Sequence, residues 1–137
     1  MKLFGKNKEL SPTEQVRGIM QYFIEASYIG LGNSRFQTVE HGLMCLTYMF
    51  GSVDMLCQAN QIDSAKTIAI FQGLLEDLLG GYAPDDAKQI MREVLRASCN
   101  PDGQRIMREG AESVRSWICG ETLAAHRLEE LLSEIGA

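Results

Sequence analysis

The sequence has little proline or valine and no long apolar run. Proline occurs three times in 137 residues, and valine is also scarce, whereas leucine, isoleucine, methionine, alanine, glutamate and arginine are plentiful. This mixture favours helices over strands. No stretch of about eighteen apolar residues occurs, so the sequence predicts no membrane-spanning helix. With 45% apolar and 23% charged residues, the composition is that of a single globular domain.

The first residues do not have the pattern of a secretory signal. The segment MKLFGKNKELSP carries lysines, but no apolar run follows them. We therefore expect a cytoplasmic protein whose cysteines are reduced. We expect residues 1–10 to form a flexible tail and residues 11–137 to form the folded domain. The net charge of −5 does not favour binding to nucleic acid or to an anionic membrane surface.

The common catalytic and cofactor-binding motifs are missing as well. There is no GxSxG motif of serine hydrolases, and no GxxxxGK[ST] or GxGxxG loop to bind phosphates. No CxxC, HxxxH or ExxH spacing is present to hold a metal. The sequence therefore predicts no cofactor and favours a non-enzymatic protein over an enzyme.

Apolar residues recur at helical spacing along most of the chain. They predict helices over about 12–29, 37–59, 63–79 and 83–99. Ser11, Pro12 and Glu14 form a capping box at the start of the first helix. From Asp102 onward the pattern predicts either one long helix or two helices that meet at Gly120. We predict an all-α domain, a five- to six-helix antiparallel bundle with the second and third helices at its centre.

The helix predicted over 37–59 is apolar on two sides. Its broad stripe comprises Val39, Leu43, Leu46, Phe50, Val53 and Cys57. A narrower stripe of Met44, Tyr48 and Met55 lies on another side, and flexible methionine surfaces suit adaptable binding. Gly42 and Gly51 interrupt this helix, and close contact with another helix is the usual reason to keep such glycines. We predict a self-associating protein, a homo-oligomer that also binds a protein partner, with Met44, Tyr48, Met55, Leu131 and Leu132 at the contact.

The segment 40–57 allows a second interpretation, a helical bundle that holds a small ligand or a metal. His41 and Cys45 are four residues apart and share a helix face, so they could supply two ligands, with His126 as a third. Cys57 lies about 18 Å further along the same helix and cannot join them. Free cysteines are readily buried, so we favour Cys45 as a core residue and treat the metal site as the alternative.

A basic ridge of Lys88, Arg92 and Arg96 is predicted on the helix over 83–99, because these residues are four apart. Such a ridge could contact an acidic partner or an RNA backbone. Acidic residues are interleaved with it, and no exposed aromatic series accompanies it. We therefore favour an ordinary solvated helix face over a nucleic-acid site.

Overall fold

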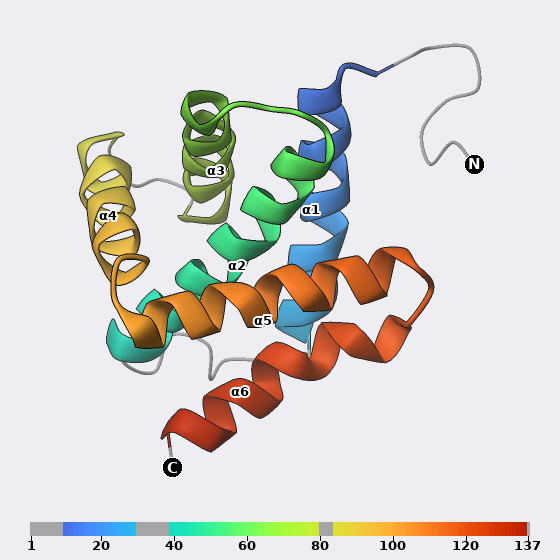
Figure 1. The fold of residues 1–137 in the computed structure, drawn as a ribbon. Helices are drawn as coiled ribbons and strands as arrows, with labels where there is room; N and C mark the ends of the chain where they lie inside the picture. Colours follow the sequence, from blue (N-terminus) through green and yellow to red (C-terminus); the bar gives the residue numbers. More distant parts are fainter. Residues whose placement is uncertain (1–9, 30–38, 80–83, 137) are drawn as a thin grey trace.

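The computed structural model describes residues 10–29, 39–79 and 84–136, and within these ranges all regular structure is helical. The elements are α1 (Pro12–Ile29), α2 (Val39–Ala59), α3 (Ser64–Leu79), α4 (Pro84–Ala97), α5 (Pro101–Ile118), the short 3₁₀ helix η2 (Thr122–His126) and α6 (Arg127–Gly136). The predicted all-α helical bundle is therefore confirmed (Figure 1). The predicted tail, apart from Leu10, lies outside the described residues. Among the described helices, none is both long enough and apolar enough to cross a membrane.

The helix starts follow from local side-chain capping. Glu14 N donates to Ser11 Oγ over 3.2 Å, and Ser11 N donates to Glu14 Oε1 over 3.0 Å, so the predicted capping box is present. At α3, Lys66 N donates to Asp63 Oδ1 over 2.8 Å. At α5, Asn100 accepts a hydrogen bond from the backbone of Gly103 and is followed by proline. These caps set where three of the helices begin.

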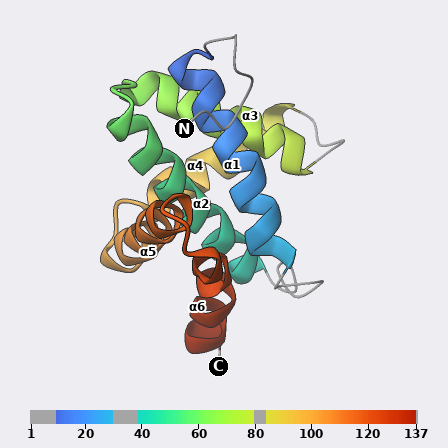
Figure 2. The same cartoon turned by 90° about the vertical axis from the view of Figure 1, so that its right-hand side faces the viewer.

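The core forms around α2, which packs against α1, α3, α4, α5 and α6. Its most extensive contact is with α5, which crosses it (Figures 1 and 2). The prediction that the third helix is also central is wrong, because α3 lies at one side against α1, α2 and α4. Aromatic side chains fill the centre: Phe23 lies 5.4 Å from Trp117, and Phe50 lies 5.0 Å from Phe71, measured between ring centroids.

Two glycines let α2 and α5 approach backbone to backbone. A Cβ atom at Gly51 of α2 would collide with the backbone of Met107, and a Cβ atom at Gly110 of α5 would collide with the carbonyl of Tyr48. Ser52 Oγ lies in the same contact, 2.9 Å from the Gly110 carbonyl oxygen and 3.2 Å from that of Tyr48. The close helix contact predicted from Gly51 is therefore confirmed, and it fixes α5 on α2.

The long C-terminal pattern is divided into two helices at Gly120. This residue has a φ of +103°, a left-handed conformation that glycine adopts without steric cost. Glu121 N donates to Ser116 O and Gly120 N donates to Trp117 O, which is the hydrogen-bond pattern of a Schellman helix end. Glu121 precedes η2 and makes no side-chain cap. The turn folds α6 back beside α5 (Figure 1).

Candidate functional site: a groove between α2 and α5

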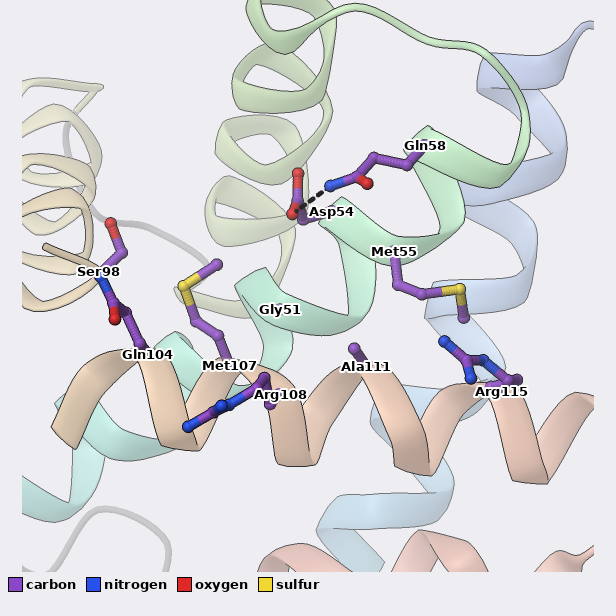
Figure 3. Close-up of a pocket in the computed structure, with 10 residues that line it drawn as sticks. All are labelled: Gly51, Asp54, Met55, Gln58, Ser98, Gln104, Met107, Arg108, Ala111 and Arg115. Atoms are coloured by element: carbon purple, nitrogen blue, oxygen red, sulfur yellow. Dashed lines mark hydrogen bonds between the residues drawn. The ribbon is translucent and has the colours of Figure 1, made fainter. Parts of the chain in front are cut away.

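A groove of about 490 Å³ opens beside the crossing of α2 and α5 (Figure 3). The α2 wall comprises Gly51, Asp54, Met55 and Gln58. The α5 wall comprises Gln104, Met107, Arg108, Ala111 and Arg115, and Ser98 lies at one end. Its volume falls in the range of roughly 300–1,000 Å³ that is usual for binding sites. Both walls belong to helices that the glycine contact holds in place.

Two methionines make the apolar part of the groove. Met55 projects from α2 towards α5, and Met107 projects from α5 towards α2 (Figure 3). Both side chains are half-buried and pack against the core. A thioether side chain is unbranched and polarisable, so it adapts to the shape of an apolar group laid against it. The groove therefore combines rigid helix backbones with adaptable apolar side chains.

Two exposed arginines, Arg108 and Arg115, give the α5 wall its positive charge. They are seven residues apart, about 10.5 Å along the helix axis, and the small Ala111 lies between them on the same wall. Neither forms an ion pair with a described residue. The negative charge of the groove lies on the opposite wall, where Asp54 Oδ2 accepts a hydrogen bond from Gln58 Nε2 over 2.8 Å.

The chemistry available in the groove is that of binding. The hydroxyl of Ser98 already donates to the carbonyl of Leu95 over 2.6 Å, and no histidine or cysteine is among the lining residues. The lining residues therefore do not place a nucleophile beside a base. What they do offer is an apolar surface beside two guanidinium groups, which can hold a chain that carries both apolar and acidic side chains.

The opposite flank of α5 carries an ion-pair cluster around Arg127 of α6. Arg127 Nε donates to Glu109 Oε1 over 3.1 Å, and Nη2 pairs with Oε2 of the same carboxylate. Glu134 and Glu130 also pair with Arg127, at 3.0 and 3.7 Å. The hydrogen bonds from Arg127 hold the pKa of Glu109 below its usual value, and those from Glu109 raise the pKa of Arg127. The cluster fastens α6 to α5.

Tyr48 lies in the core beside this cluster. Its hydroxyl has no hydrogen-bond partner among the described residues, although Ser113 approaches it closely enough to favour the ionised form. Burial outweighs that contact and raises the pKa of Tyr48 to about 12. Within the described part of the chain the hydroxyl is therefore a desolvated polar group without a hydrogen bond.

The residues predicted as an interface are divided between the groove and the core. Met55 lines the groove, and Met44 is half-buried and packs against the core. Tyr48 and Leu131 are fully buried and Leu132 nearly so. These three side chains are used inside the chain and offer no surface to a partner in this arrangement.

Two residues of the alternative metal site, Cys45 and His126, lie in different surroundings. Cys45 is buried in the core, whereas the side chain of His126 is 52% exposed and its Nδ1 lies 3.9 Å from Glu129 Oε2. The side chain of His41 lies outside the described part of the chain. Within the described residues, no three histidine, cysteine, aspartate or glutamate side chains form a group that could hold a metal ion.

The predicted basic ridge lies on the exposed face of α4. Lys88, Arg92 and Arg96 are all exposed. Arg92 donates to Gln89 Oε1 over 3.1 Å, and Arg96 pairs with Glu93 at 3.2 Å. The two arginines are therefore engaged by neighbours on their own helix, as is usual for a solvated face.

The α5 wall of the groove was not predicted as a site. Met107 has the helical spacing of a core residue, and Arg108 and Arg115 lie on a segment that also carries acidic residues. The available signal was the spacing of Arg108, Ala111 and Arg115, which places them on one stripe of a helix. Nothing in that spacing shows which helix faces the stripe.

No protein-family model, no curated protein and no solved structure matches this chain.

Proposed function

We propose that this chain is a non-catalytic helical protein that binds a segment of a protein partner in the groove between α2 and α5. The observation that carries the proposal is the placement of Met55 and Met107 on facing walls of that groove. Their helices are held together through Gly51 and Gly110. A preorganised groove loses little conformational entropy on binding, and its methionines fit apolar groups of different shapes.

The methionines themselves provide the test. The full chain, labelled with ¹³C at the methionine methyl groups, is titrated with peptides selected on it from a library of helical peptides. We expect the methyl signals of Met55 and Met107 to shift, while those of the fully buried Met20 and Met49 stay in place. If the selected peptides leave the Met55 and Met107 signals unchanged, the groove is not the binding site and this part of the proposal is refuted. In the Met55→Lys variant, with a charge in the groove, the remaining groove signal, that of Met107, should no longer shift.

Self-association is part of the same proposal, in the simplest case as a homodimer. It is supported by two exposed apolar side chains at the corner where α5 ends: Ile118, 45% exposed, and Leu123, 78% exposed. Sedimentation velocity over a range of concentrations should show an assembly larger than one chain, and Leu123→Asp should shift it towards the monomer. A wild-type chain that sediments as a monomer throughout would refute self-association and leave the groove proposal intact.

A cytoplasmic location completes the proposal. Cys99 and Cys119 are free thiols at the surface, which suits a reducing compartment. Cell fractionation with an antibody to the protein should place it in the cytoplasmic fraction, and recovery from an oxidising compartment would refute this location.

A further inference from the structure

We infer that the partner segment is an amphipathic helix with two acidic residues seven positions apart, which pair with Arg108 and Arg115 of α5. This inference rests on the proposed function of the groove and adds the chemical class of its occupant. Apolar side chains between the two acids would lie on Met55 and Met107. The inference depends on which arginines lack a partner, on the spacing of the two guanidinium groups and on the charge of the facing wall.

The first argument is that Arg108 and Arg115 differ from the other arginines of the described chain. Arg17 pairs with Asp77, Arg96 with Glu93 and Arg127 with three glutamates. Arg92 donates to Gln89, and Arg105 lies close enough to Glu109 to lower the pKa of that carboxyl group. Arg108 and Arg115 have neither an ion pair nor a hydrogen bond with a described residue. Arg105 has neither as well, but its charge acts on Glu109. The charge of Arg108 and Arg115 is therefore available to an acidic ligand.

The second argument is the spacing on α5. Two residues seven positions apart on a helix lie on nearly the same face, about 10.5 Å apart. A partner helix that lies along α5 carries its own residues at the same spacing, so two carboxylates at positions i and i+7 meet both guanidinium groups at once. Ala111 lies between Arg108 and Arg115, and its short side chain leaves room between them for a bound helix. Binding of an amphipathic helix in a groove uses this i, i+3, i+4, i+7 pattern of anchors.

The third argument is the charge of the α2 wall. Asp54 lies on it and is bound to Gln58. A carboxylate placed against that wall would be repelled, so the acids of the partner are restricted to its α5 side. The groove thus selects a helix with acidic residues along one edge and apolar residues next to them, and it disfavours a ligand that is anionic all round.

The test uses two labelled helical peptides of about sixteen residues, a length at which isolated helices become marginally stable. The acidic peptide has glutamates at i and i+7 and leucines at i+3 and i+4, and the control peptide has lysines in place of the two glutamates. Fluorescence anisotropy with the full chain at low salt should show that the acidic peptide binds at least about tenfold more tightly. In the variant Arg108→Glu/Arg115→Glu this preference should be reversed.

The matched control variant is Arg92→Glu/Arg96→Glu, which changes the net charge equally but on the exposed face of α4. It should bind the acidic peptide within about threefold of the wild type, because surface charges outside the contact act weakly. A loss in this variant as large as that in the groove variant would overturn the inference, because the attraction would then be a property of the net charge.

Three further outcomes would also overturn it. The first is that the two peptides bind equally well. The second is that neither binds, while a library-selected peptide shifts the Met55 and Met107 signals. In both cases the groove binds a partner of another class, and only the proposed function stands. If a single-stranded RNA oligonucleotide displaces the acidic peptide from the wild type and fails to bind the Arg108→Glu/Arg115→Glu variant, the two arginines serve a polyanion.

Discussion

The two flanks of α5 use arginine in opposite ways. On one flank Arg127 of α6, with 27% of its side chain exposed, pairs with Glu109, Glu130 and Glu134. On the other flank Arg108 and Arg115 are exposed and pair with no described residue. The first arrangement fastens one helix of the chain to another, whereas the second leaves two charges beside an apolar groove. Arg127 thus supports the structure of the chain, whereas Arg108 and Arg115 are the arginines that our proposal assigns to a ligand.

The change with the largest expected effect disrupts the contact between α2 and α5, on which both flanks of α5 depend. Gly110→Val places a side chain against the backbone carbonyl of Tyr48, so α5 has to move away from α2. We expect the free energy of unfolding to fall by about 3 kcal/mol or more, measured by urea denaturation. Gly73→Ala is the control, because among the described residues its added methyl group meets only the Arg17 side chain, at 3.6 Å. This control should be neutral or should stabilise α3 by up to about 1 kcal/mol.

Neutralising one arginine on each flank tests the comparison directly. Arg127→Met removes the ion pair with Glu109, whose side chain is only 21% exposed, and should lower the free energy of unfolding by about 1–2 kcal/mol. Arg108→Met removes an exposed side chain that has no ion pair among the described residues. This variant should change the free energy of unfolding by less than about 0.5 kcal/mol. Equal losses in urea denaturation would contradict the distinction between the two flanks.

The difference in stability between wild type and Glu109→Gln should depend on pH. The pKa of Glu109 is lowered in the folded chain, so its ion pair contributes stability fully above the unfolded pKa of about 4.3. That contribution is lost as the pH falls through the lower folded pKa. Urea denaturation between pH 7 and pH 3 should therefore show wild type and Glu109→Gln converging at the acid end. A constant difference across this range would show that the ion pair is not its source.

A neutral or slightly stabilising effect is expected beside the ion-pair cluster, at Tyr48. Its buried hydroxyl has no hydrogen-bond partner among the described residues, so Tyr48→Phe removes a desolvated polar group and keeps the aromatic packing. The free energy of unfolding should stay the same or rise by up to about 1 kcal/mol. A loss of more than 1 kcal/mol in thermal or urea denaturation would show that the hydroxyl is bonded, for instance to a buried water. Phe23→Leu, in the same core, is the control that should destabilise.

The helices were predictable from sequence because their signals are local. Ser11 and Glu14 are three residues apart and cap the same helix, and Gly51 within an apolar helix indicates a close neighbour whatever that neighbour is. The sequence indicates Gly120 as the position of a break, but it is equally compatible with a continuous helix. Only the positive φ of Gly120 shows that the helix ends there.

The partner of each helix face was not predictable in the same way. Periodicity shows which side of α2 is apolar, but not that α5 rather than α3 covers it. For this reason Tyr48, Leu131 and Leu132 were expected at an interface, although the fold of the chain itself buries them. The groove depends on the same information, because Met55 and Met107 come together only once Gly51 and Gly110 have set the crossing.

The contact between α2 and α5 also determines when the chain can fold during its synthesis. The hydrogen bond from Ser52 to Gly110 joins residues 58 positions apart, so at about 5–20 residues per second several seconds pass between the synthesis of the two. During that interval the apolar surface of α2 has no α5 to cover it and is open to aggregation or to a chaperone. A nascent chain that ends before Gly110 should therefore be protease-sensitive, and protection should appear only after α5 has left the ribosome.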